Sequence, residues 1–196
     1  MEEFSLRTII FDTETTDINP GDICQIAYIV IDNGIKVRNY YFEVDYINPS
    51  AQRVHGLSVE ALKGLSGGKR FSDYIDEIER DFCNADIIAG HNVSFDIKFL
   101  KEEFNRCDRV LTYKKEFCTM KHFTNICKIK KNDGKFKYPR LEELINFLNI
   151  NEKDIMGKTA SLYNSLENDY HDARFDAVAT YMCILKAKKM NINLLG

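Results

Sequence analysis

The stretch TIIFDTE, residues 8–14, decides the fold because it joins a short apolar, β-branched run to two acidic residues. The apolar run has the composition of a buried β-strand. Side chains alternate along a strand, so Asp12 and Glu14 lie on the same side of it. Two carboxylates held together repel each other unless a cation lies between them, and hard oxygen ligands suit Mg²⁺ or Mn²⁺. We therefore expect this strand to end with half of a metal site.

The rest of the chain predicts a mixed α/β sheet. Antiparallel strands are expected at 6–12, 23–32 and 35–44, with a two-residue hairpin turn at Asn33-Gly34. Shorter strands are expected at 87–89 and 113–117, and helices from Ser72 and over 94–104, 120–129, 141–148 and 172–190. Residues 48–68 are expected to be irregular, and 149–170 carries no decisive pattern. Antiparallel strands followed by alternating strands and helices indicate one domain over residues 1–196.

Composition narrows the classes of function. The chain has 196 residues, is 44% hydrophobic and carries a net charge of −3, so it can bury a sizeable core but cannot wrap duplex nucleic acid by charge alone. A small site that binds the end of a nucleic-acid strand remains an alternative. We expect no signal peptide and no membrane span, hence a cytoplasmic protein, or a nuclear one if the source is eukaryotic or viral.

The six cysteines include no C-x-x-C pair. Cys24 and Cys183 lie in apolar patterns, which favours buried free thiols in a reducing compartment. Cys118, His122 and Cys127 suggest zinc, but their spacing matches no structural zinc pattern.

Two further carboxylates lie on helix faces that should be buried. Asp96 precedes Phe99 and Leu100 by three and four residues, so it shares their face, although an acid in a first helical turn also simply complements the helix dipole. Asp176 lies among small residues that indicate close packing, although an exposed acid on an amphipathic helix is the alternative. A buried carboxylate needs a partner, so both are candidate ligands.

His171 precedes Asp176 by five residues. On one regular helix these side chains point in different directions, at about 100° per residue. They can reach one site only if His171 precedes the helix and Asp172 is its N-cap. A lone histidine with a structural role is the alternative.

In combination, these residues resemble the three motifs of the DEDD superfamily of 3′–5′ exonucleases, in the subgroup with histidine, DEDDh. The motifs are FDTETT at 11–16, GHNVSFD at 90–96 and HDARFD at 171–176, and VHGLS at 54–58 resembles a loop of epsilon-like members. The resemblance extends from Ile10 to about Leu185. Two departures are Arg174-Phe175, where smaller residues are usual, and Gln25, where many members carry glutamate.

The resemblance implies a ribonuclease H-like fold, with a five-stranded mixed sheet flanked by helices. It also implies a 3′–5′ exonuclease that uses two Mg²⁺ or Mn²⁺ ions to release nucleoside 5′-monophosphates. Asp12, Glu14 and Asp176 would hold the first ion, and Asp12 and Asp96 the second. His171 would be the general base that activates water. The implied contacts to the terminal nucleotides come from Thr13, Thr15, His55, Leu57, Asn92 and Phe95.

Several alternatives remain open from the sequence. A catalytically silent nucleic-acid binding module would keep the fold, but all five catalytic residues are present here. An internally cutting nuclease of the ribonuclease H-like group is disfavoured by the histidine of the third motif. Single-stranded DNA is expected as substrate, with RNA trimming as the alternative. Any polymerase partner would act in trans, and the oligomeric state is undetermined.

The segment 128–140 is basic, with Phe136 and Tyr138 interleaved among its lysines. It predicts either a guide for a nucleic-acid backbone or a solvated basic hairpin.

Overall fold

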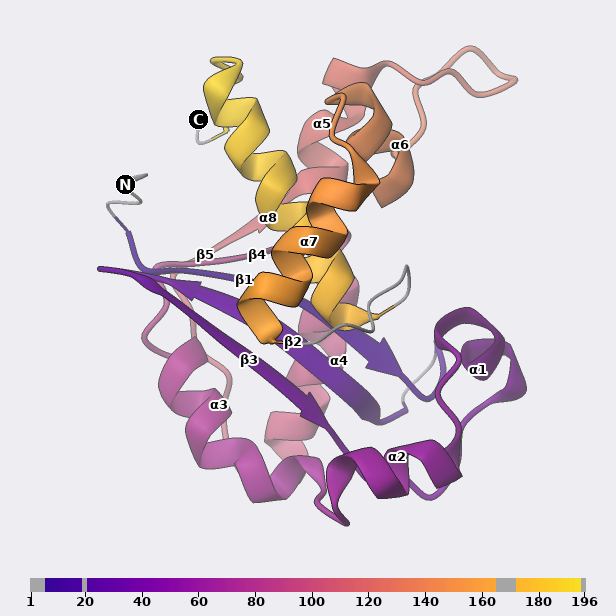
Figure 1. Cartoon of the computed structure of the whole chain (residues 1–196), viewed down its shortest axis with the longest axis vertical. Coiled ribbons are helices and arrows are strands. Elements are labelled where there is room, and N and C mark those ends of the chain that lie inside the picture. The colour runs from indigo at the N-terminus through magenta and orange to yellow at the C-terminus, as the bar shows by residue number, and fades with distance from the viewer. Residues whose placement is uncertain (1–5, 19–20, 165–171, 195–196) are drawn as a thin grey trace.

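A five-stranded sheet forms the centre of the molecule in the computed structural model, which describes residues 6–18, 21–164 and 172–194. The strand order is β3-β2-β1-β4-β5. The strands are β1 (Thr8–Thr15), β2 (Ile23–Ile31), β3 (Ile35–Tyr41), β4 (Ile87–Gly90) and β5 (Lys115–Cys118). The first three strands pair antiparallel, whereas β4 runs parallel to β1 and β5 parallel to β4. The predicted mixed sheet is thereby confirmed, and it has the arrangement of the ribonuclease H-like fold (Figure 1).

Helices cover both faces of this sheet (Figure 1). The 3₁₀ helix η1 (Phe71–Tyr74), α3 (Ile75–Phe82) and α4 (Val93–Arg106) pack on one face. The opposite face is covered by α5 (Thr119–Cys127), α6 (Leu141–Phe147), α7 (Glu152–Tyr163) and α8 (Ala173–Lys189). Two short helices, α1 (Pro49–His55) and α2 (Val59–Ser66), follow β3. Among the described residues, no helix combines the length and apolarity needed to cross a membrane.

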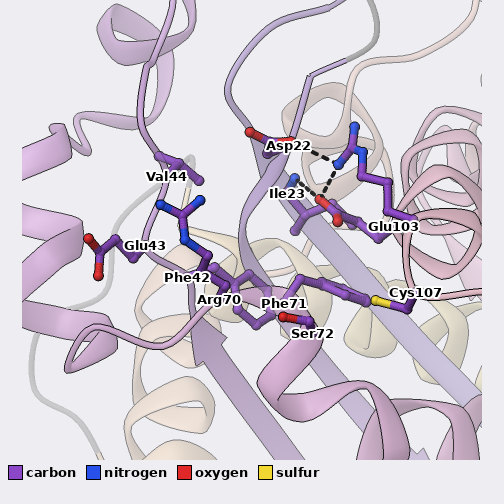
Figure 2. A pocket seen from close by; sticks show the side chains of 11 residues that line it. Asp22, Ile23, Phe42, Glu43, Val44, Arg70, Phe71, Ser72, Glu103 and Cys107 are labelled. Atoms are coloured by element: carbon purple, nitrogen blue, oxygen red, sulfur yellow. Dashed lines mark hydrogen bonds and ion pairs between the residues drawn. The ribbon is translucent and has the colours of Figure 1, made fainter.

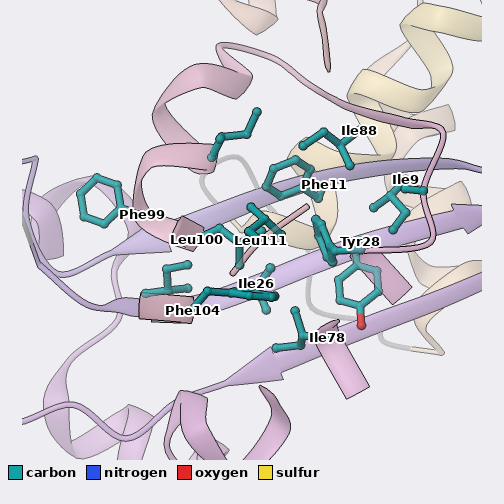
Figure 3. Close-up of a cluster of buried hydrophobic side chains, with 14 of the residues drawn as sticks. Ile9, Phe11, Ile26, Tyr28, Ile78, Ile88, Phe99, Leu100, Phe104 and Leu111 are labelled. Atoms are coloured by element: carbon teal, nitrogen blue, oxygen red, sulfur yellow. The ribbon is translucent and has the colours of Figure 1, made fainter. Parts of the chain in front are cut away.

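The core is divided by the alternation of side chains along β1. Ile9 and Phe11 point toward α3 and α4, where Figure 3 shows them packed with Tyr28 and the aromatic side chains of α4. Ile10 points the other way and packs in the cluster that includes α8. The even-numbered residues of β1 therefore face α8, which places the side chains of Asp12 and Glu14 on that side.

Strand bounds differ from the prediction: β3 ends at Tyr41 and not at 44, and β5 covers Lys115–Cys118 and not 113–117. Two further differences concern β1 and the hairpin. β1 continues to Thr15, past its predicted end at Asp12, because β2 pairs with it along the whole acidic stretch. The β2–β3 hairpin loop has three residues, 32–34, instead of two, since Ile31 pairs with Ile35.

Three helical features were missed by the prediction. The segment expected to be irregular contains α1 and α2, and the unassigned segment contains α7. Their ends carry capping signals: Asn48 accepts a hydrogen bond from Ser50 N ahead of α1, Ser58 caps α2 and Asn151 caps α7. Short helices with little apolar periodicity are recognisable mainly by such caps. Ser72 lies inside η1, so it is not the predicted N-cap of α3.

The cysteines behave as predicted. All six are free, and Cys24 and Cys183 are buried. Among the described residues, no cluster of cysteine and histidine could hold a metal ion.

Candidate active site

Three carboxylates meet between β1 and α8. Asp12, Glu14 and Asp176 each offer one oxygen, and these three oxygens lie within 4.8 Å of one another. Asp12 and Glu14 come from one face of β1, and Asp176 comes from the first turn of α8, which packs against β1. Three hard oxygen donors converging on one point fit a divalent cation such as Mg²⁺ or Mn²⁺. Asp176 thus lies in the predicted cluster and not on an exposed helix face.

Asp96 reaches β1 from the other layer. It lies in the first turn of α4, is only 4% exposed, and accepts hydrogen bonds from Thr13 N at 3.1 Å and Thr13 Oγ1 at 2.7 Å. The pairing of β4 with β1 ends at Ile10, so β4 provides no hydrogen-bond acceptor for the N–H of Thr13. The carboxylate of Asp96 accepts that hydrogen bond instead. The predicted buried position of Asp96 is confirmed, and a role limited to the helix dipole is excluded by these bonds. It is not one of the three oxygens that converge within 4.8 Å.

The carboxylates strongly perturb one another. Burial, followed by the charges of Asp96, Asp176 and Glu14, raises the pKa of Asp12 well above its ordinary value. Burial and the charges of Asp176 and Asp96 raise the pKa of Glu14 in the same way. Burial raises the pKa of Asp96 to about 7 against the opposing hydrogen bonds from Thr13. Without a cation, ionisation of these carboxyl groups is therefore disfavoured, and a bound cation would favour it.

The turn from β4 into α4 requires two special residues. At Gly90 a Cβ atom would lie 3.0 Å from the carbonyl oxygen of Phe11, so only glycine allows this close approach of β4 to β1. Asn92 has φ = 67°, a left-handed conformation that asparagine tolerates better than most residues. Its side chain is exposed and makes no hydrogen bond with the described residues. This turn sets the position of Asp96 one helical turn later.

The remaining predicted substrate contacts lie on three elements. Thr15 is buried at the end of β1, where its hydroxyl donates to Asp17 O at 2.8 Å. His55 ends α1 and its Nδ1 accepts from Leu57 N at 3.1 Å, while Leu57 packs partly against a small apolar cluster. Phe95 is half-buried on α4 beside Phe99. Their contacts with substrate stay predictions.

His171 lies outside the described residues, so its role as a base also stays a prediction. The predicted start of α8 is confirmed, because Asp172 caps the helix by accepting from Arg174 N at 2.9 Å.

One positioning network was missed by the sequence prediction. Gln25 is 1% exposed and donates from Nε2 to Asn39 Oδ1 at 2.9 Å and to Asp172 Oδ1 at 3.2 Å. Arg174 forms an ion pair with the same Asp172 carboxylate. The two departures from the family pattern, Gln25 and Arg174, therefore meet at the residue that starts α8. Their common partner was not visible in the sequence, because Gln25 and Asp172 are far apart along the chain.

Gln25→Glu should destabilise the metal-free protein more at pH 8 than at pH 5. The new carboxylate would lie beside Asp172 and opposite Glu14, its partner across β1 and β2, and like charges repel most when both are ionised. Urea unfolding in the presence of a chelator at the two pH values measures this difference. Gln25→Leu is the control, because it removes the same hydrogen bonds without adding charge and should cost about 1–3 kcal/mol at both pH values. A loss that is independent of pH in Gln25→Glu would contradict the prediction.

His91 also has a role that the sequence did not reveal. Its Nε2 lies 3.0 Å from Pro139 O and its Nδ1 lies 3.0 Å from Thr119 Oγ1. Burial lowers the pKa of His91 to about 4, so the ring is neutral at pH 7 and donates one hydrogen bond to the Pro139 carbonyl. His91 thus ties the β4–α4 turn to the segment that precedes α6.

A separate pocket of about 230 Å³ lies where β2 begins and α4 ends. Figure 2 shows Glu103 at its wall, where it accepts a hydrogen bond from Ile23 N at 2.9 Å and pairs with Arg106 at 2.9 Å. None of the four site carboxylates lines this pocket. Among its charged groups, Arg106 pairs with Asp22 and Glu103, and Arg70 pairs with Asp45 outside the pocket.

Comparison with known proteins decides the family. The family model described as an exonuclease, RNase_T, matches residues 9–182. The chain belongs to this exonuclease family. The predicted membership of the DEDD exonuclease superfamily is confirmed by this match, which spans the three motifs at 11–16, 90–96 and 171–176.

Two kinds of relative share part of the sequence. DNA polymerase III subunit epsilon of Rickettsia felis is 37% identical over 115 residues, which are 54% of this chain and 47% of the relative. The PolC-type DNA polymerase III of Streptococcus mutans is 28% identical over 102 residues, which are 51% of this chain and 7% of that protein. The chain therefore spans about half the length of the epsilon subunit it matches.

Solved structures confirm the fold. Exonuclease I of E. coli, solved in complex with a dA16 oligonucleotide, superposes with a TM-score of 0.70 over 94% of this chain and 41% of that chain. The sequence identity is 19%, so this likeness concerns the fold alone.

Proposed function

We propose that this protein is a metal-dependent 3′–5′ exonuclease that hydrolyses single-stranded DNA from its 3′ end and releases nucleoside 5′-monophosphates. The observation that carries the proposal is the convergence of Asp12, Glu14 and Asp176 within 4.8 Å, with Asp96 bonded to the residue between the first two. The family match supports a nuclease, and the names of the epsilon and exonuclease I relatives support DNA as the substrate.

Asp12, Glu14 and Asp176 would hold one divalent cation, and Asp96 would support a second beside Asp12. Two bound cations would lower the pKa of the attacking water and neutralise the negative charge that develops on the reacting phosphate. The site is suited to this role because its carboxylates are crowded, mostly buried and raised in pKa, so a cation relieves their repulsion.

The protein residues would orient the reacting groups. Thr13 fixes the carboxylate of Asp96 through two hydrogen bonds, and the β4–α4 turn presents the exposed amide of Asn92, four residues before Asp96. Phe95 offers an aromatic side chain for a terminal base, and His55 and Leu57 would border the nucleotide from the α1–α2 turn. His171 would take the proton from the attacking water, because its ordinary pKa near 6.5 suits neutral pH.

The name of the epsilon relative supports a proofreading role beside a DNA polymerase, which is part of the proposal. RNA trimming is the second candidate. That residues 1–196 form a single exonuclease domain also stays a prediction.

Matched single-stranded DNA, RNA and duplex substrates, labelled at the 5′ end, test the proposal. With Mg²⁺ or Mn²⁺ we expect a ladder of products shortened from the 3′ end of single-stranded DNA, and no products with chelator. A 3′-phosphorylated oligonucleotide should resist digestion. Digestion of the blocked oligonucleotide at internal positions, or of RNA only, would overturn the proposal as stated.

His171→Ala should reduce kcat by about 10²-fold or more while KM changes much less, because a general base acts on the transition state and not on substrate binding. Single-turnover digestion of a short oligonucleotide measures the two effects separately. His122→Ala is a control, since His122 lies on α5 and is not among the predicted site residues. Equal losses in kcat and in substrate binding would argue against a base.

A further inference from the structure

The basic segment 128–140 folds as an antiparallel ribbon. Lys130 and Phe136 form a β-bridge, Lys131 N donates to Lys135 O at 2.7 Å, and Lys137 N donates to Ile129 O at 2.8 Å. Gly134, at φ = 80°, allows the turn at the tip. Figure 1 shows this ribbon, between α5 and α6, projecting beyond the rest of the molecule. The segment is therefore a defined structure that presents its side chains to the surroundings.

Positive charge is concentrated on this ribbon, although the chain as a whole carries a net charge of −3. Its basic residues are Lys128, Lys130, Lys131, Lys135, Lys137 and Arg140, against one acid, Asp133. Lys137 pairs with Glu143, but Lys128, Lys130, Lys131 and Lys135 are exposed and form no ion pair with any described residue.

Two aromatic side chains lie exposed among these lysines. Phe136 is 38% and Tyr138 is 58% exposed. A purely solvated hairpin gains nothing from exposed rings, whereas lysines interleaved with aromatic side chains match the pattern of surfaces that bind a single strand by its phosphates and bases.

The base of the ribbon is joined to the catalytic layer. Pro139 is buried, and its carbonyl accepts the hydrogen bond from His91, the residue before Asn92 in the turn that leads to Asp96. At the other end, Arg140 N donates to Glu143 Oε2 at 2.8 Å as α6 begins. The ribbon is thus held to the same turn that positions Asp96.

We propose that the ribbon 128–140 binds the phosphate backbone of the single strand whose 3′ end enters the carboxylate site. This inference rests on the proposed function. The cluster of Asp12, Glu14, Asp96 and Asp176 offers no positive side chain to a polyanion, so we assign the protein's attraction for the strand to basic residues away from this cluster. The four unpaired lysines supply that attraction to nucleotides upstream of the 3′ end. Exposed lysines attract the carboxylates of an acidic protein as well as the phosphates of a nucleic acid. Binding of an acidic protein is therefore the competing outcome of the test.

The triple variant Lys130→Gln/Lys131→Gln/Lys135→Gln tests the inference. Its matched control is Lys36→Gln/Lys63→Gln/Lys153→Gln, which removes the same charge from exposed lysines on β3, α2 and α7. Fluorescence anisotropy with a labelled 20-nucleotide single strand, in chelator to prevent digestion, gives the dissociation constant over a range of NaCl concentrations. The ribbon variant should bind about tenfold more weakly than wild type at 0.1 M NaCl, and its salt slope should fall by about 2, at about 0.7 per lost phosphate contact. The control should match wild type.

Hydrolysis of a trinucleotide separates the two proposals. This substrate is too short to extend far from the carboxylates, so wild type and the ribbon variant should digest it at the same rate. If wild type digests neither length, the proposed function fails. If both lengths are digested but the ribbon variant binds the 20-nucleotide strand as wild type does, only the ribbon inference fails, and an acidic protein becomes the preferred partner. Equal losses on the trinucleotide and the long strand would also overturn the inference.

Discussion

Asp12→Asn should lower the rate of metal-dependent digestion by about 10³-fold or more. Removing a single group that stabilises charge in an active site has an effect of about this size. Asp12 supplies one of the three converging oxygens, and the charge of Asp96 also acts on it. Its loss would therefore disturb both proposed cation positions. Asp176→Asn should have a comparable effect. Initial rates on a 5′-labelled single strand, over a range of Mn²⁺ concentrations, measure the loss.

The same substitution should stabilise the metal-free protein at pH 7.5. Asparagine keeps the shape of aspartate but removes the carboxyl group whose own pKa is raised by burial and by the charges of Asp96, Asp176 and Glu14. Asp154→Asn, an exposed acid in the first turn of α7, is the matched control and should leave activity unchanged. Full activity in Asp12→Asn would contradict the metal-site assignment. A lower melting temperature in chelator would indicate that Asp12 has a structural role instead.

The stability of the metal-free protein should fall as pH rises from about 4 to about 7. Because the pKa values of Asp12, Glu14 and Asp96 are raised in the folded state, that state keeps protons which the unfolded chain has already released. The folded state then binds more protons over this range, so the free energy of unfolding decreases with pH. For Asp96, a rise from 3.8 to about 7 corresponds to on the order of 4 kcal/mol.

Urea unfolding in chelator at pH 5 and pH 8 measures this effect against Asp96→Asn. The asparagine can still accept the two hydrogen bonds from Thr13 but cannot titrate, so the variant should lose less stability between the two pH values than wild type. Added Mn²⁺ should stabilise wild type more at pH 8 than at pH 5, because metal binding requires ionised carboxylates. Identical pH dependence in wild type and Asp96→Asn would contradict the assignment of the raised pKa.

Several features were predictable because they depend on local pattern. The strand at β1, the shared face of Asp12 and Glu14 and the cap at Asp172 follow from alternation along a strand and from capping chemistry. The helices α1, α2 and α7 were missed because they are short or weakly amphipathic, and their existence depends on caps and on packing against elements distant in the sequence.

The sequence by itself determined the identity of the acidic residues, the faces on which they lie and the family to which the chain belongs. The tertiary structure decided which groups meet: Asp176 with the β1 pair, Thr13 with Asp96, Gln25 with Asp172, and His91 with Pro139. The physical reason is that each local feature depends on neighbours within a few residues. These four contacts instead join residues separated by dozens of positions or more, and only the packing of α4, α6 and α8 around the sheet brings them together.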